Sequence, residues 1–321
     1  MCEEMSFATA LEAGNLALIR CFPKADLHNH FVLGGCRDYI HAHTGRMIPP
    51  VTQPLHSLKE MEAWSRAHVH SRDPAQRRLL LEATFHQAKT DGVTVLEIGE
   101  DVWGLSEFYD GDVDALVRAF HDARNAIAPD IELRLQIGLS RHCAIDYLLR
   151  QLEPFWCHEA FYSIDLYGDE LAQPIERFIP IYRKAKQCGL RLKAHVGEFG
   201  TAADVRRAVE ALELDEVQHG IAAAKDARVT RFLADHRIRL NITPSSNVLL
   251  GRVPSMAEHP IACLHRSGVI VTVNSDDVLI FDSDVSKEYL RLYTSGCLTA
   301  QELDEIRLQG LHAASPSPRP G

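Results

Sequence analysis

Short apolar runs rich in β-branched residues recur along nearly the whole chain, and segments with apolar residues at helical spacing lie between most of them. Runs of this length are typical of buried strands, and apolar positions at i, i+3 and i+4 are typical of helices. The predicted strands are residues 25–30, 94–100, 132–140, 161–166, 191–195, 216–219, 238–243 and 269–276. The predicted helices are 8–21, 77–90, 112–127, 175–188, 203–212, 227–236 and 300–311.

This alternation predicts βαβ units and therefore a parallel sheet. Residues 269–273 are almost continuously apolar, which suits a parallel strand that is covered on both faces. Eight units in 321 residues favour a (β/α)₈ barrel over a doubly wound sheet. The first strand is followed by His28-Asn29-His30 and not by a glycine-rich phosphate loop, which argues against a dinucleotide-binding fold.

Residues 34–76 form a long excursion between the first two strands, with a short helix predicted at 58–67. On a barrel, an insertion here lies over the carboxyl-terminal mouth, so we predict a lid. Phe31, Met61 and Trp64 either form an apolar cap over a bound base or bury the insertion itself. We expect one domain over residues 1–314 and a flexible Pro- and Ser-rich tail over 315–321.

Composition narrows the class of protein. Lys and Arg number 34 against 44 Asp and Glu, so the net charge of −10 argues against a nucleic-acid partner. No apolar stretch is long enough to span a bilayer, and the first residues are acidic, so we expect a cytoplasmic protein without a membrane partner. The 8 cysteines include no CxxC pair, which predicts scattered reduced thiols and no disulfide framework.

Polar clusters follow the predicted strands, at the end of a barrel where active sites are built. Histidine is frequent, with 17 in the chain. The clusters hold His28 and His30 after the first strand, His195 and Glu198 after the fifth, His219 after the sixth, and Asp276 and Asp277 after the eighth. Three imidazoles and a carboxylate suit Zn²⁺ with an open position for water, with His28, His30, His195 and Asp276 as ligands.

Such a metal makes bound water a nucleophile near neutral pH. His219 and Asp277, beside the metal, are placed to take the proton of that water and to orient the attacking oxygen. Glu198, three residues beyond His195, is placed to act as an acid toward the substrate if its surroundings raise its pKa.

Seven motifs in this order resemble the adenosine deaminase branch of the amidohydrolase superfamily. The family's PKxELHxH opening is similar to PKADLHNH at 23–30, its DLxGxE to DLYGDE at 165–170, and its HxGE to HVGE at 195–198. Its HG, PxSN, HP and N-[ST]-D-D segments are similar to residues 219–220, 244–247, 259–260 and 274–277.

The resemblance implies one zinc ion on His28, His30, His195 and Asp276, and hydrolytic deamination of a 6-aminopurine. It also implies that His219 and Asp277 orient the attacking hydroxide and that Glu198 protonates the adjacent ring nitrogen. The backbone at Gly168 would face the purine, where a side chain would crowd the ring. The implied partners are a small purine substrate and water; the oligomeric state stays open.

Two departures from the family pattern bear on the substrate. Val32 stands where adenosine-specific members carry an acidic residue that grips a sugar hydroxyl. An unpaired buried hydroxyl costs about 1–3 kcal/mol, so Val32 argues against adenosine itself as the physiological substrate. Glu100 and Asp101 end the second strand and argue against a phosphorylated substrate unless the lid supplies arginines, although we expect them to be a solvated loop pair.

Two alternatives to an adenine deaminase stay open. The same metal site on this fold also serves hydrolysis of other amine-bearing or amide heterocycles. A non-catalytic binding protein on a decayed barrel is the third class, and it would be marked by loss of a ligand or of Glu198, neither of which is lost. The insertion histidines, His41, His43, His56, His68 and His70, are expected on the surface and not in a second metal site.

Overall fold

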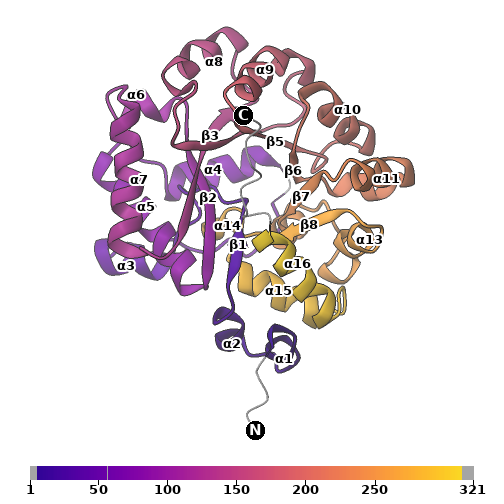
Figure 1. Cartoon of the computed structure of the whole chain (residues 1–321). Helices are drawn as coiled ribbons and strands as arrows, with labels where there is room; N and C mark the ends of the chain where they lie inside the picture. Colours follow the sequence, from indigo (N-terminus) through magenta and orange to yellow (C-terminus); the bar gives the residue numbers. More distant parts are fainter. Residues whose placement is uncertain (1–5, 56, 313–321) are drawn as a thin grey trace.

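The computed structural model describes residues 6–55 and 57–312. Eight strands form one parallel sheet in chain order, from β1 to β8, and curve into a nearly closed barrel (Figure 1). They are β1 (Lys24–Asp26), β2 (Val93–Asp101), β3 (Glu132–Ser140), β4 (Phe161–Tyr167), β5 (Arg191–Val196), β6 (Glu216–His219), β7 (Arg239–Ile242) and β8 (Ile270–Val273). This confirms the predicted (β/α)₈ barrel and the place of all eight strands.

The first and last strands meet beyond their ends. Within the described residues β1 and β8 share no ladder, but Asn29 and Asp276 form a parallel bridge. The Asp276 N–H donates to the His28 carbonyl at 2.9 Å, and the Leu27 N–H donates to Asn274 Oδ1 at 2.8 Å. The barrel therefore closes through the two segments that carry predicted metal ligands.

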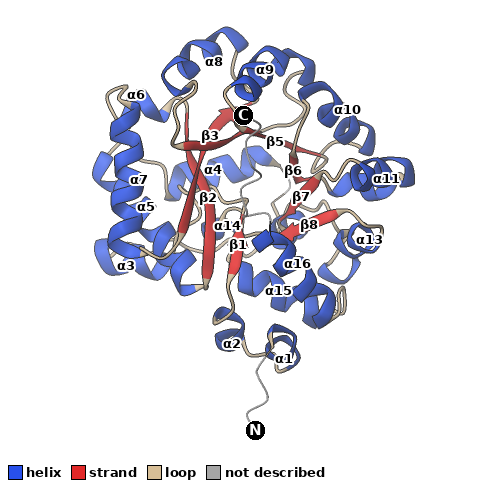
Figure 2. Ribbon diagram, in the orientation of Figure 1, coloured by secondary structure: helices blue, strands red, loops and turns tan. Residues whose placement is uncertain are grey.

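Helices surround the strands, as Figure 2 shows. Before and within the insertion they are α1 (Phe7–Glu12), α2 (Leu16–Arg20), α3 (Arg37–Thr44), α4 (Leu58–His68) and α5 (Pro74–Thr90). Along the barrel they are α6 (Gly104–Phe108), α7 (Val113–Ile127), α8 (Ile145–Leu152), α9 (Ile179–Gln187), α10 (Ala202–Leu212) and α11 (Ala227–Asp235). The last are α12 (Pro244–Leu249), α13 (Ile261–Arg266), α14 (Val278–Phe281), α15 (Val285–Thr294) and α16 (Ala300–His312), with 3₁₀ turns η1 (Glu153–Phe155), η2 (Ile175–Phe178), η3 (Ile221–Lys225) and η4 (Met256–Glu258).

Several predicted boundaries were wrong. The single helix expected at 8–21 is broken into α1 and α2 at Gly14, whose φ of 61° no helix accommodates. The first strand ends at Asp26, before the histidines, and the last ends at Val273. Helices α3, α8, α13 and α15 were not predicted, because each has only 6 to 10 residues and so shows at most two or three turns of helical spacing.

The insertion packs against the barrel through small apolar clusters. Ile40, Ile48 and Val69 pack with Leu80 and Leu279, and together they attach α3 and the residues after it to the barrel. The predicted short helix is α4. That this segment opens and closes as a lid stays a prediction. The predicted tail, 315–321, lies outside the described residues.

Two further findings concern the chain as a whole. No helix in the described ranges combines the length and the apolar character needed to cross a membrane. The expectation of reduced thiols throughout was wrong for one pair, since Cys157 and Cys188 form a disulfide between the residues before β4 and the end of α9. The sequence hid this pair because the two cysteines are 31 residues apart and only the fold brings their Cα atoms to 4.7 Å.

Candidate active site

The carboxyl-terminal ends of the strands open into a cavity of about 710 Å³. The predicted site residues that line it are His30, Gly168, His195, Glu198, His219, Asp276 and Asp277. His28 lies just behind this wall, with its ring centroid 4.7 Å from those of His195 and His219. The fold therefore brings together side chains that the sequence placed at five different strand ends.

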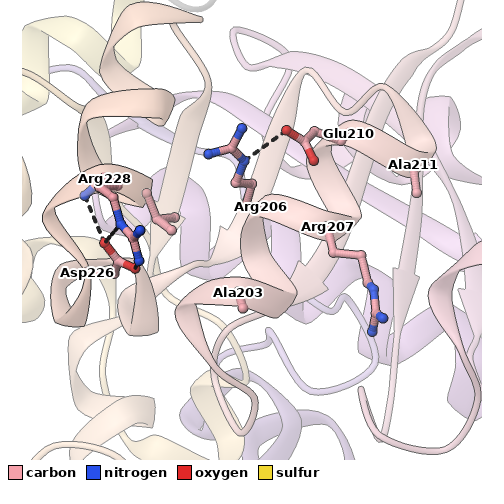
Figure 3. Close-up of a pocket in the computed structure, with 8 residues that line it drawn as sticks. Ala203, Arg206, Arg207, Glu210, Ala211, Asp226 and Arg228 are labelled. Atoms are coloured by element: carbon pink, nitrogen blue, oxygen red, sulfur yellow. Dashed lines mark hydrogen bonds and ion pairs between the residues drawn. The ribbon is translucent and has the colours of Figure 1, made fainter.

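A second hollow, of about 660 Å³, lies on the outer helices α10 and α11 (Figure 3). It is rich in arginine, but each guanidinium is already paired: Arg206 with Glu210, Arg207 with Glu176, and Arg228 with Asp226. Since these pairs are exposed and complete, we place the chemistry in the cavity at the strand ends.

Hydrogen bonds determine which ring nitrogens of His28 and His195 carry a proton. The Nδ1 of His28 lies 3.0 Å from the Asn241 carbonyl oxygen, which can only accept, so this nitrogen donates. The Nδ1 of His195 lies 3.3 Å from the Asp165 carboxylate and donates to it in the same way. Both Nε2 atoms are then unprotonated in the neutral rings, and they face each other at 2.9 Å. Two facing lone pairs repel unless a cation lies between them, so this pair fits a metal ion.

Oxygen and further nitrogen donors surround this pair. Asp276 Oδ1 lies 3.7 Å from His30 Nε2 and 3.9 Å from His28 Nε2. Within the described residues, two sets of three side chains have ligand atoms close enough to share an ion: His28, His195 and His219, or His28, His30 and Asp276. The four predicted ligands span both sets, and the first set adds His219 as a competitor.

Two carboxylates each direct one unpartnered oxygen into the cavity wall. Glu198 Oε1 and Asp277 Oδ1 are buried and have no hydrogen-bond partner among the described residues. The other oxygen of Glu198, Oε2, lies 3.6 Å from His219 Nε2. Burial, together with the negative charges of Asp276 and Glu170, raises the pKa of Glu198 well above its ordinary value. A protonated carboxyl with a free oxygen is suited to donate a proton to a ligand.

The backbone is strained at two of these positions. His219 and Asp276 adopt left-handed backbone conformations, with φ of 63° and 60°, which residues other than glycine rarely adopt. Gly168 also has a positive φ, 86°, and a Cβ built there would lie 3.2 Å from His142 Nδ1. The glycine keeps this part of the cavity wall free of a side chain.

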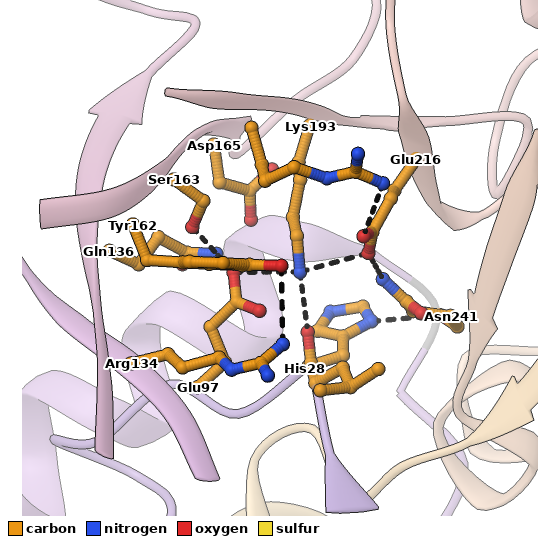
Figure 4. A network of polar contacts seen from close by, with 12 residues as sticks. His28, Glu97, Arg134, Gln136, Tyr162, Ser163, Asp165, Lys193, Glu216 and Asn241 are labelled. Atoms are coloured by element: carbon orange, nitrogen blue, oxygen red, sulfur yellow. Dashed lines mark hydrogen bonds and ion pairs between the residues drawn. The ribbon is translucent and has the colours of Figure 1, made fainter. Parts of the chain in front are cut away.

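A buried charged network, which we call the charged floor of the barrel, lies beside His28 (Figure 4). Lys193 is fully buried, with its Nζ 2.7 Å from Glu97 and 3.1 Å from Glu216. The same Nζ donates to the Leu27 carbonyl at 3.3 Å, and Glu216 accepts from Asn241 Nδ2 at 2.8 Å. Since Leu27 precedes His28 and the Asn241 carbonyl binds its ring, this network supports the loop that carries His28.

The acidic pair at the end of β2 is not the solvated pair that we expected. Glu100 is buried and forms a two-point ion pair with Arg77, and the Arg77 guanidinium lies over the rings of Phe31 and Phe108. Burial and the neighbouring Glu100 charge raise the pKa of Asp101, which lines the cavity, to about 7. The expectation failed because the partner, Arg77, is 23 residues away and belongs to α5.

The insertion contributes one wall of the cavity. Met61 of the insertion lines it together with Phe31, which precedes the insertion, whereas Trp64 packs among Leu250, Ile280 and other apolar side chains. Of the histidines expected on the surface, His41, His43 and His70 are exposed and His68 is half-buried. His70 nevertheless lines the cavity, and His56 lies outside the described residues.

The sequence reasoning assigned no role to several side chains that the structure places at the site. Asp165 and Asn241 hold the ligand histidines, and Tyr167 lies with its ring centroid 5.2 Å from that of His30. Asn247 and His259 lie behind His219. Asp165, Asn247 and His259 lie within the matched motifs, but a motif does not show which neighbour a side chain contacts.

Comparison with known proteins agrees with this geometry. A family model described as adenosine deaminase matches residues 68–318. A putative adenosine/adenine deaminase from Treponema pallidum is 33% identical over 287 residues, which cover 89% of this chain and 96% of that protein. The chain belongs to the adenosine deaminase family.

Solved structures show the same fold. An adenine deaminase from Arthrobacter aurescens superposes with a TM-score of 0.76 at 23% identity, covering 92% of this chain and 94% of that one. An amidohydrolase from Burkholderia ambifaria, solved with bound Zn, superposes with a TM-score of 0.78 at 20% identity, covering 99% of this chain and 91% of that one. This member of the adenosine deaminase family is thus a hydrolytic aminohydrolase on a (β/α)₈ barrel, and a divalent metal is the family's cofactor.

Proposed function

We propose that this protein hydrolytically deaminates an adenine-containing nucleoside or base, giving an inosine- or hypoxanthine-type product and ammonia. The observation that carries the proposal is the pairing, in one cavity, of two facing histidine lone pairs with a buried glutamate that has a free oxygen. Family membership supports the substrate class, since the Treponema pallidum relative is described as an adenosine/adenine deaminase.

The residues that would hold the metal are His28, His30, His195 and Asp276, and their nitrogen and oxygen atoms suit one Zn²⁺. When bound, zinc supplies the Lewis acidity that makes water a nucleophile near neutral pH. Asp165 and the Asn241 carbonyl hold the protons of His195 and His28 on Nδ1, so the two Nε2 lone pairs would be available to the ion, as is usual for histidine ligands.

Glu198 is the proposed proton donor. Its raised pKa keeps a proton on the carboxyl, and its free oxygen is placed to give that proton to the purine ring nitrogen beside the amine-bearing carbon. Protonation weakens the aromaticity of the ring at the carbon that water attacks. The oxygen of water then bonds to this carbon and one water proton passes to the amine. The C–N bond breaks to release ammonia, and the other water proton returns to Glu198 as the ring carbonyl forms. His219 and Asp277 orient the attacking oxygen, and Gly168 leaves room for the ring.

The walls of the cavity favour an uncharged substrate over a nucleotide. Two arginines line the cavity, but Arg77 is held by Glu100, and Arg66 lies 3.6 Å from Glu62. With Asp101 near Arg77, a phosphate would meet no unpaired guanidinium among the described residues that line the cavity, and it would meet one further acid. Val32 lines the cavity as well, and it offers no partner to a sugar hydroxyl. We therefore propose adenine or an adenosine modified at its sugar or at N6 ahead of adenosine and AMP.

The experiment is ammonia release by zinc-loaded protein from adenine, adenosine, 2′-deoxyadenosine, 5′-modified adenosines, N6-substituted adenines and AMP. A kcat/KM of about 10⁴ M⁻¹s⁻¹ or more on one uncharged member supports the proposal. Glu198→Gln is the matched control: it should keep the fold and the zinc but lose at least about 100-fold in kcat. His195→Ala should lose the zinc as well. If every compound fails with zinc present in stoichiometric amount, the purine assignment is wrong.

A further inference from the structure

A chain of hydrogen bonds runs from the start of α13 to His219, and its direction is set at its far end. The backbone N–H of Ile261 lies 3.1 Å from His259 Nδ1. A backbone N–H can only donate, so His259 Nδ1 accepts. Burial lowers the pKa of His259 to about 3, which keeps the ring neutral. A neutral ring that accepts at Nδ1 carries its proton on Nε2.

The proton on His259 Nε2 in turn orients the side-chain amide of Asn247. His259 Nε2 lies 3.2 Å from Asn247 Oδ1, so its N–H donates to that oxygen. The amide is then oriented with its NH₂ group toward His219, and Nδ2 lies 3.2 Å from His219 Nδ1. An amide NH₂ only donates, so His219 Nδ1 accepts and the proton of the neutral ring is on Nε2.

Neighbouring groups are compatible with this assignment. The Thr243 hydroxyl lies 3.0 Å from His219 Nδ1 and is free to donate to it, since a hydroxyl serves either role. Asn247 and His259 are buried, so water does not compete for these bonds. The Nε2 of His219, on the other side of the ring, faces the cavity and lies 3.6 Å from Glu198 Oε2.

His219 therefore differs from His28 and His195 in one decisive respect. The Nδ1 atoms of His28 and His195 face a carbonyl and a carboxylate, which accept, and their Nε2 atoms are left with lone pairs. The Nδ1 of His219 faces an amide NH₂, which donates, and its Nε2 is left with a proton. A protonated nitrogen neither binds a metal nor takes a proton from water.

We propose that His259 and Asn247 are positioning residues that hold His219 with its proton on Nε2, so that His219 donates a hydrogen bond to the attacking oxygen. In this role His219 is neither a metal ligand nor the base that deprotonates water. The inference rests on the proposed function for its catalytic meaning. It reduces the two possible metal sets to the one without His219. Since Glu198 already holds the proton that it gives to the ring, the inference leaves Asp277, which also has a free buried oxygen, as the group that accepts the water proton.

The direct test is the tautomer of His219, read by two-bond ¹H–¹⁵N correlation spectra of protein labelled with ¹⁵N-histidine, with and without zinc. The protonated and unprotonated nitrogens of a neutral imidazole resonate far apart, and the signals of His219 are those missing from His219→Gln. We expect the proton on Nε2 in both states. A proton on Nδ1, or zinc bound to Nε2, would overturn the inference. No substrate is needed, so a failure of the deaminase proposal leaves this reading intact.

Variants of the relay give an independent test. Asn247→Asp keeps the size of the side chain but replaces the donating NH₂ with an oxygen that accepts, so His219 should move its proton to Nδ1. We expect kcat to fall at least tenfold with little change in KM, because a wrong histidine tautomer is costly and has reduced kcat by about 10⁴ in another hydrolase. Thermal unfolding of the variant monitors the fold.

His259→Leu and His259→Gln form the matched pair for the far end of the relay. Leucine cannot donate to Asn247 Oδ1, so the amide is free to turn and His219 should show both tautomers. Glutamine offers an amide N–H and should restore the wild-type spectrum and most of kcat. If the leucine variant keeps the spectrum of the wild type, or if both variants lose the same activity with unchanged tautomers, His259 has only a structural role.

Discussion

Lys193→Met tests whether the charged floor of the barrel supports the metal site. The wild-type ammonium is fully buried between Glu97 and Glu216, at 2.7 and 3.1 Å. Methionine has a similar length but no charge, so both carboxylates lose their shared cation. Breaking a buried ion pair by removing one partner costs about 3–5 kcal/mol, because an uncompensated charge stays buried.

The size of the effect follows from the length of the chain. An unfolding entropy of about 2.1 cal/mol/K per residue over 321 residues makes 1 kcal/mol equal to about 1.5 °C in Tm. The expected loss is therefore about 4–7 °C, measured by calorimetry. Adding Glu97→Gln removes one of the two unpaired buried charges and should recover part of the lost Tm. The double variant is therefore the matched control.

The same variant should weaken zinc binding, because Lys193 also holds the Leu27 carbonyl next to His28. Loss of an outer partner of a metal ligand typically costs 10- to 100-fold in affinity. Titration with a chelator measures this change at a temperature where both proteins are folded. A Tm within 1 °C of the wild type would refute the charge argument, and an unchanged zinc affinity would refute the link to His28.

Three further predictions concern the substrate, the disulfide and the pH dependence of stability. Val32→Asp should raise kcat/KM for adenosine about tenfold relative to the preferred substrate, since a carboxylate there can pair with a sugar hydroxyl; an unchanged ratio means that residue 32 does not face the sugar. Cys157→Ser with Cys188→Ser should lower the unfolding free energy by about 4 kcal/mol in denaturant titrations, given a loop of 31 residues, and equal midpoints would contradict this. The thiol state of protein taken from cells also tests the predicted cytoplasmic location, where disulfides are rare. Burial raises the pKa of Glu288 to about 7, so the folded state holds this proton more tightly than the unfolded state. Relative to Glu288→Gln, the wild type should be fully stabilised below about pH 4.5 and lose about 3 kcal/mol as the pH rises to 8; parallel stability curves would exclude this.

The sequence predicted the barrel because a buried parallel strand is marked by a short apolar run within its own residues. All eight strands were found from short apolar runs, and most of the longer helices were found from apolar residues at helical spacing. The missed helices α8 and α15 also bury one face, but they are only 8 and 10 residues long, too short for helical spacing to stand out in the sequence. The ends of β1 and β8 were also misplaced, because the loops that follow have the same extended, partly apolar character as the strands.

Much of the candidate site was also predicted from local sequence, from the polar residues that follow each predicted strand. Parallel strands bring their carboxyl ends to one edge of a sheet, so polar residues after successive strands are expected to meet. His195 with Glu198, and Asp276 with Asp277, needed no further information to be placed in one cavity. Their order along the chain also carries the family resemblance, which the comparisons confirm.

Contacts between distant segments were decided only by the tertiary structure. The Arg77–Glu100 pair, the Cys157–Cys188 bond and the contacts of Lys193 join residues from different elements, and no local pattern marks either partner. The tautomers of the histidines belong to this class too, since a ring's proton is placed by the group that faces its other nitrogen. The sequence by itself determined which side chains reach the mouth of the barrel. The packing behind them decided which nitrogens hold lone pairs and which hold protons, because donors and acceptors act only over hydrogen-bond distances that folding alone creates.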